Sequence, residues 1–112
     1  MVRPTEFKIT RGDTQTGVTL SISGDLDLGT VPVLAESVER HLGDGVETLT
    51  LDLGELSFMD STGLRLLIEL DQQARREGWD LTLIRPRHET ASTVLKATGA
   101  DSALAFKDSP ER

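Results

Sequence analysis

The residues best placed to do chemistry are Asp60 and Ser61, which stand with Thr62 and Gly63 at the start of a predicted helix. Asp and Ser are favoured N-cap residues because their oxygens accept hydrogen bonds from the first N–H groups of a helix. The same position suits a phosphoserine, because those N–H groups and the helix dipole stabilise an anion. A phosphate on Ser61 would add roughly −1.5 to −2 charges. Capping and phosphorylation are compatible, so both interpretations stay open.

A second group of acids, Asp25 and Asp27, stands directly after a predicted strand. The segment is typical of a polar turn closed by an Asx-type hydrogen bond. Leu26 and Leu28 are expected to point inward, which leaves the two acids on a shared outward side. If this turn lies beside Ser61, the acids can orient a kinase or repel an anionic partner.

The residue types argue against a metal site or a thiol site. The chain has no cysteine, which excludes disulfides, thiol nucleophiles and cysteine-ligated metals. His41 and His88 are far apart and lack the His-Glu-x-x-His pairing of a helical zinc site. A Mg²⁺ site built from Asp25, Asp27 and Asp60 is disfavoured by the order of the elements. We therefore expect no metal and no cofactor.

Two enzyme classes fit the sequence poorly. A Ser-His-Asp hydrolase using Ser61 and His88 needs a glycine two residues before the serine, and the chain has none there. A receiver-type phosphoacceptor needs acids after its first strand and a lysine after a late one. Here the acids follow the second strand, and Arg85 follows the fourth. We expect no catalytic residue and no enzymatic activity.

Hydrophobic periodicity predicts the elements that position these residues. Alternating apolar residues predict strands at about 5–11, 17–23, 47–53, 79–83 and 103–106. Apolar residues at helical spacing predict helices at about 31–42, 62–77 and 91–98. Thr30 is placed to cap the first helix, and Gly43, Gly78 and Gly99 are placed to end the three helices. Turn-forming residues at 12–17 predict a hairpin between the first two strands.

The order β-β-α-β-α-β-α-β predicts an α/β fold. Parallel strands joined by right-handed helical crossovers form a mixed, mostly parallel sheet with an N-terminal β-hairpin and about three packed helices. The 112 residues fit one domain, residues 1–112 with short frayed ends.

Charge and hydropathy restrict the partners. The net charge of −7 and pI near 4.7 argue against nucleic acid and anionic lipid as partners, since both attract basic residues. The longest apolar runs fall far short of the roughly 20 residues that span a membrane. No N-terminal segment resembles a signal peptide, so we expect a cytoplasmic protein without membrane insertion.

The segments Gly24-Asp25-Leu26-Asp27 and Ser57–Leu64 together resemble the STAS domain of bacterial anti-sigma factor antagonists. The resemblance extends over about residues 5–106 in element order and length. It implies partner switching. The unphosphorylated form binds an anti-sigma factor that is also a serine kinase of the GHKL type, and so frees a sigma factor. Phosphorylation of Ser61 breaks that complex, and a PP2C-type phosphatase reverses it. Stress response and sporulation are the processes that such proteins regulate.

The resemblance also implies which residues form the partner surface. They are Asp25, Asp27, Asp60, Ser61, Thr62 and Gly63. Thr62 stands where other members carry a second serine, and some relatives phosphorylate threonine, so Thr62 is a second candidate acceptor. STAS domains also serve as protein-binding subunits of stress-signalling scaffolds and lipid-transport complexes, and this alternative stays open.

Overall fold

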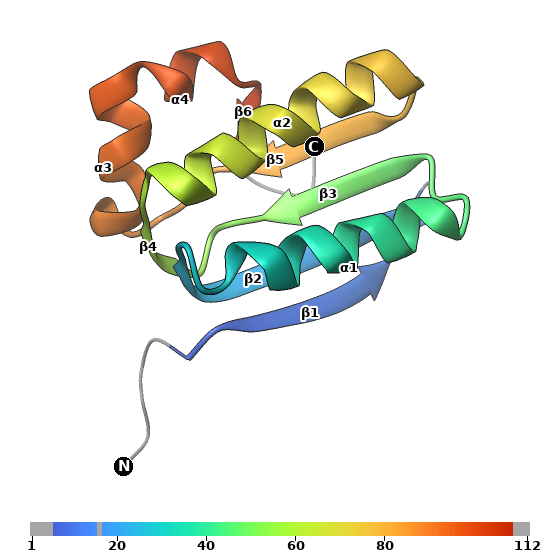
Figure 1. Ribbon diagram of the computed structural model, residues 1–112, viewed down its shortest axis with the longest axis horizontal. Helices are drawn as coiled ribbons and strands as arrows, with labels where there is room; N and C mark the ends of the chain where they lie inside the picture. The colour runs from blue at the N-terminus through green and yellow to red at the C-terminus, as the bar shows by residue number, and fades with distance from the viewer. Residues whose placement is uncertain (1–5, 16, 109–112) are drawn as a thin grey trace.

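A computed structural model describes residues 6–15 and 17–108, which fold around a six-stranded sheet (Figure 1). The strands are β1 (Lys8–Asp13), β2 (Val18–Leu26), β3 (Thr48–Asp52), β4 (Leu56–Met59), β5 (Asp80–Ile84) and β6 (Phe106–Lys107). The helices are α1 (Val31–Gly43), α2 (Ser61–Glu77), α3 (Glu89–Thr98) and α4 (Ala100–Ala103). Thr5, the predicted start of the first strand, lies outside the described residues. None of these helices is long and apolar enough to span a membrane.

The sheet has the order β1-β2-β3-β5-β6, with β4 beside β2. β1 pairs with β2 in antiparallel orientation, and the other pairs are parallel. The N-terminal hairpin and the mixed, mostly parallel sheet are therefore confirmed.

β2 has the most partners in the sheet, because it pairs with three other strands. β1 pairs with residues 18–23 of β2, β3 pairs with residues 18–21, and β4 pairs with residues 24–26. The register shifts beside Gly24, whose φ of 93° favours a residue without a side chain. Periodicity predicts a short connection rather than a strand at residues 56–59, since four residues give too little alternation to indicate a strand. Pairing with the end of β2 makes this segment β4.

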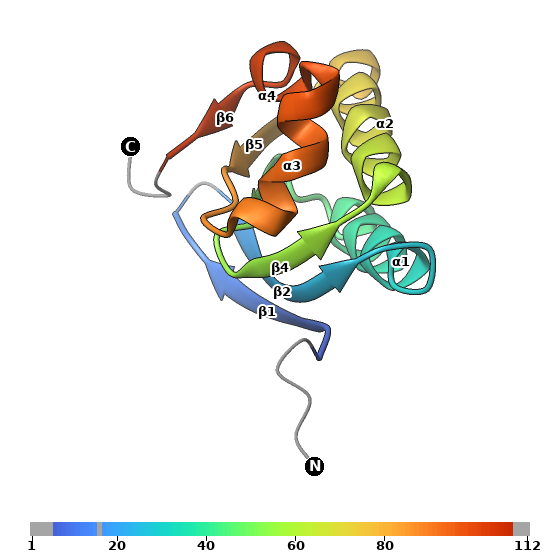
Figure 2. The ribbon, with the colours of Figure 1, turned by 90° about the vertical axis from the view of Figure 1, so that its left-hand side faces the viewer.

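One face of the sheet forms the core, and α1 and α2 cover it side by side (Figure 2). Along β2 the buried residues alternate as predicted, with Val18, Leu20 and Ile22 facing the helices. Each fully buried aliphatic side chain stabilises the fold by roughly 1.5–3 kcal/mol. In α2, Leu64 and Leu67 are buried as expected. The helical spacing also predicts that Ile68 points inward; this prediction is wrong, since 37% of the residue is exposed.

The helices end at the glycines that the sequence predicts, but the predicted side-chain cap at the start of α1 is not made. Gly78 and Gly99 end α2 and α3 with φ of 82° and 81°, as glycine at a helix C-terminus permits. Thr30 precedes α1 but makes no side-chain cap. Its hydroxyl donates instead to the backbone oxygen of Asp25 at 2.7 Å. The predicted role of Thr30 as a capping side chain is therefore wrong.

The C-terminal segment also differs from its prediction. Residues 103–106 were expected to form a strand, whereas α4 continues to Ala103 and the strand β6 comprises Phe106 and Lys107. β6 exists through its parallel pairing with β5, in which Phe106 lies opposite Leu83. So short a strand depends on its neighbour rather than on its own alternation.

Candidate functional site

The two motifs meet where β2 and β4 end. These parallel strands run side by side (Figure 2). In their register, Leu26 lies opposite Met59. The backbone N–H of Asp60 donates to the backbone oxygen of Leu26 at 3.3 Å. The acidic turn after β2 and the start of α2 are thereby joined, which is the condition for a common site.

Asp60 caps α2 and leaves Ser61 at the surface. The backbone of Asp60 is extended, and its Oδ1 accepts hydrogen bonds from the N–H groups of Thr62 and Gly63 at 2.9 and 3.1 Å. Ser61 is the first residue of the helix and is exposed, whereas Thr62 is half-buried. Because the neighbouring carboxylate supplies the cap, the Ser61 hydroxyl is not needed for that purpose.

Gly63 allows α2 to begin this close to the sheet. A Cβ at this position would lie 2.8 Å from the backbone oxygen of Leu26 and 2.9 Å from the Cγ of both Leu26 and Met59. Side chains do not approach so closely in a packed core. Gly63 therefore sets the position of the helix end that presents Ser61.

The turn after β2 is held by Asp27. Its Oδ1 accepts hydrogen bonds from the N–H groups of Gly29 and Thr30 at 3.0 and 3.3 Å. The Asp27 N–H in turn donates to the Thr30 hydroxyl at 2.9 Å. The predicted Asx-type turn is confirmed, and it holds the Asp27 carboxylate in front of α1.

Asp25 occupies a different environment from Asp27. It belongs to β2 and is half-buried on the face of the sheet opposite the buried leucines. Its Oδ1 is buried, with no hydrogen-bond partner among the described residues. As predicted, Asp25 lies on the side opposite the buried Leu26, but it is half-buried, as Asp27 is, rather than fully open to solvent.

Leu28 lies at the surface, contrary to its prediction. It was expected to point inward, yet 75% of it is exposed. The alternation of β2 stops at Leu26, and Leu28 belongs to the turn held by Asp27. In the sequence, Asp27 and Gly29 were the residues that indicated this turn. We define the Ser61 patch as Asp27, Leu28, Asp60 and Ser61.

The two histidines lie in different environments. His41 is buried on α1, and His88 is the exposed residue that precedes α3. Over residues 6–15 and 17–108, no group of three His, Cys, Asp or Glu side chains is arranged to hold a metal ion.

Comparisons with known proteins give a family match over most of the chain. A family model described as the STAS domain matches residues 8–111. The anti-sigma-F factor antagonist RsfB of Mycobacterium tuberculosis is 33% identical over 67 residues, which cover 60% of this chain and 55% of that protein. An anti-sigma-B factor antagonist of Staphylococcus aureus is 39% identical over 49 residues, covering 44% of this chain and 45% of the relative.

Solved structures share the fold. An anti-sigma factor antagonist from Mycobacterium paratuberculosis superposes with a TM-score of 0.83 at 21% identity, over 99% of this chain and 93% of that one. The anti-sigma factor antagonist SpoIIAA in its unphosphorylated form gives a TM-score of 0.71, also at 21% identity, over 95% and 91% of the two chains. At 21% identity, the likeness to these structures establishes the shared arrangement of helices and strands and nothing beyond it.

Proposed function

The chain belongs to the STAS domain family, and from that premise we propose that it acts as an anti-sigma factor antagonist. In this role it is a binding module without catalytic activity. It engages an anti-sigma factor and so regulates transcription that depends on a sigma factor. The cytoplasm is the proposed place of action, because transcription is the proposed target. The names of the relatives support the partner class.

The observation that carries the proposal is the exposed Ser61 on a helix end already capped by Asp60. A kinase needs a reachable hydroxyl, and Ser61 lies at the surface. The phosphate that it would receive adds roughly −1.5 to −2 charges. The N-terminal position favours that anion by roughly 0.3–1 kcal/mol, so the domain can carry it without unfolding.

The proposed cycle is partner switching at the Ser61 patch. Unphosphorylated chain binds the anti-sigma factor, which we propose is a GHKL-type serine kinase. Phosphorylation of Ser61 releases the complex, because a partner that covers the hydroxyl would have to bury a dianion. A PP2C-type phosphatase would restore the binding form. Asp25, Thr62 and Gly63 complete the proposed partner surface, with Thr62 as the second candidate acceptor.

Phosphate incorporation tests this assignment. We expect a kinase captured from the native host with this chain, supplied with ATP, to add one phosphate that mass spectrometry places on Ser61. The half-buried Thr62 is less accessible to the kinase, so Thr62→Val keeps the incorporation while Ser61→Ala abolishes it. Phosphate found exclusively on Thr62 would reject the assignment.

Leu28 is expected to be an anchor for the partner. Because 75% of Leu28 is exposed, a partner that covers it removes an aliphatic side chain from water, which favours binding. We expect Leu28→Ser to weaken binding of the anti-sigma factor at least about tenfold, measured by calorimetric titration.

Two controls separate recognition from folding at Leu28. Because 75% of the residue is exposed, Leu28→Ser should change the unfolding free energy by less than about 0.5 kcal/mol. Leu28→Met keeps an apolar side chain of similar volume and should retain binding. Undiminished binding of Leu28→Ser would remove this residue from the interface.

A further inference from the structure

A groove between β1 and α1 lies apart from the Ser61 patch, since none of its lining residues belongs to that patch. Its volume of about 580 Å³ falls within the roughly 300–1,000 Å³ typical of small-ligand sites. The apolar part of the lining consists of Phe7 directly before β1, Ile9 on β1, Leu20 on β2 and Val33 on α1. Val33 is 50% exposed, so a ligand in the groove covers apolar surface that otherwise contacts water.

The charged groups around the groove balance one another. The positive ones and the negative ones are, respectively, Lys8, Arg11 and Arg40, and Asp13, Glu36 and Asp44. Asp13 takes part through its ion pair with the lining residue Arg11, at 2.8 Å. A charged ligand would lose hydration here without a net opposite charge to replace it. The groove therefore favours a neutral ligand.

His41 presents a hydrogen-bond acceptor to the groove. The residue is only 7% exposed and lines the groove from α1. Its Nδ1 lies 2.7 Å from the backbone oxygen of Ser37, and this is the one hydrogen bond of the ring within the described residues. A carbonyl only accepts, so Nδ1 carries the hydrogen and Nε2 of the neutral ring carries a lone pair. Buried acceptors are normally paired, so Nε2 calls for a donor from outside the chain.

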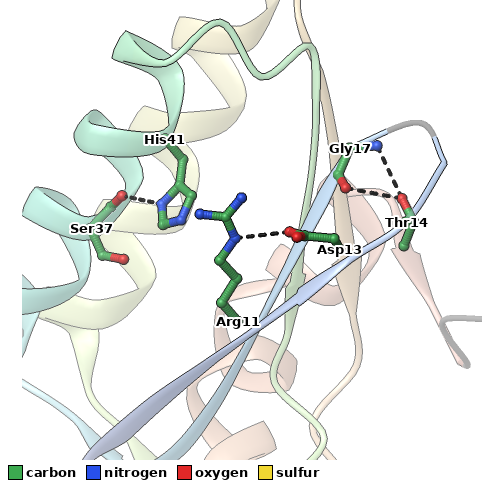
Figure 3. A network of polar contacts seen from close by, with 6 residues as sticks. All are labelled: Arg11, Asp13, Thr14, Gly17, Ser37 and His41. Atoms are coloured by element: carbon green, nitrogen blue, oxygen red, sulfur yellow. Dashed lines mark hydrogen bonds and ion pairs between the residues drawn. The ribbon is translucent and has the colours of Figure 1, made fainter.

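Arg11 presents donors toward the same point. Its side chain extends from β1 toward His41 (Figure 3). Its Nε donates to Oδ1 of Asp13 at 2.8 Å, which leaves the two terminal nitrogens of the guanidinium as donors. A hydroxyl both donates and accepts, whereas an ether oxygen only accepts. One hydroxyl group between these two side chains therefore matches both of them.

We propose that this groove binds a neutral hydroxyl compound with an apolar body, of the class of alkylphenols. The apolar body lies against Phe7, Ile9 and Val33, which line the groove on both sides. The hydroxyl donates to Nε2 of His41 and accepts from a terminal nitrogen of Arg11. The site is independent of the Ser61 patch, so binding of the compound does not require the proposed anti-sigma factor.

4-Propylphenol is the probe that tests the proposal, titrated into the full chain at about pH 8, above the range in which imidazoles ordinarily protonate. We expect saturable binding, with the largest amide NMR shifts at Ile9, Val33 and His41. 4-Propylanisole keeps the apolar body and the oxygen but lacks the donor, so it should bind about fivefold more weakly. 4-Propylbenzoate carries a negative charge and should bind no more tightly than the phenol. Absence of saturable binding, equal affinity for phenol and ether, or tighter binding of the anion would overturn the proposal.

His41→Phe removes the lone pair and keeps an aromatic ring. It should weaken binding of 4-propylphenol about fivefold and leave that of 4-propylanisole unchanged, so that the two compounds bind alike. A preference for the phenol that survives this change would refute the role of His41. The unmodified chain gives the same test if the variant does not fold. The NMR resonance of Nε2 should move when the phenol is added and stay in place with the ether, and an unmoved resonance would also refute that role.

Val33→Ser locates the apolar body of the compound. Because Val33 is 50% exposed, the change should leave the fold intact, and it should weaken binding of both compounds about threefold. Ile68→Ser is the matched control, since it removes an aliphatic side chain that is 37% exposed on α2, outside the lining of the groove. It should leave both affinities unchanged. An equal loss in Ile68→Ser would mean non-specific adsorption to apolar surface, and would refute the groove.

Discussion

Ser61→Asp is expected to weaken the complex with the anti-sigma factor by roughly 100-fold, whereas Ser61→Ala binds within about threefold of the unmodified chain. The reason is the position of the hydroxyl. Ser61 is exposed at the start of α2, directly after the Asp60 carboxylate. A partner that covers this surface must desolvate the added charge beside an existing one, and like charges at an interface cost several kcal/mol. Alanine adds no charge and removes one hydroxyl.

Binding constants from calorimetric titration decide this prediction. Ser102→Asp introduces the same charge at an exposed residue of α4 and should bind like the unmodified chain. Equal affinities of Ser61→Ala and Ser61→Asp would contradict a switch based on charge. The thermal midpoint of Ser61→Asp should stay nearly constant, because a helix N-terminus tolerates an anion. A fall of more than roughly 8 °C would indicate unfolding instead.

Gly63→Ala is expected to destabilise the domain by roughly 1–3 kcal/mol. An alanine within a helix is ordinarily favoured over glycine by roughly 1 kcal/mol, so the sign depends on the surroundings. Here the added Cβ would lie 2.8 Å from the backbone oxygen of Leu26, and a backbone atom cannot move aside without shifting β2. Chemical denaturation measures the loss, and each kcal/mol corresponds to a midpoint shift of roughly 4–8 °C.

Gly43 offers the matched control. It lies in the last turn of α1, and nothing would lie within 4 Å of an added Cβ. Gly43→Ala should therefore keep or raise the unfolding free energy, by up to about 1 kcal/mol. If Gly63→Ala were as stable as Gly43→Ala, the close approach of α2 to Leu26 would not determine the position of Ser61.

Most elements could be predicted because their residues carry a regular pattern. β2 alternates over nine residues, and α2 keeps one apolar face over 17 residues. Such runs specify their own type, since a period of two or of 3.6 residues buries one face. Short elements lack that information. β4 has four residues and β6 has two, and both are strands because a neighbouring strand completes their hydrogen bonds.

Within the site, the helix-capping motif at Asp60 and Ser61 gave better predictions than hydrophobic periodicity did. The acid before Ser61 indicated a helix cap, and Asp60 performs it. Periodicity failed at Leu28, because β2 ends two residues earlier. The capping preference failed for Thr30, whose hydroxyl donates to the backbone oxygen of Asp25 and does not cap α1. Competing hydrogen bonds of this kind depend on the path of the backbone.

The residue order by itself determined the α/β class, the N-terminal hairpin, the glycine-terminated helices and the segment that begins α2. All of these depend on local periodicity, turn chemistry and capping. Only the tertiary structure decided that the ends of β2 and β4 lie together, that Leu28 faces solvent, and that His41 shares a groove with Arg11. These features join residues distant in the chain, so they depend on strand pairing and helix packing, which no local pattern contains.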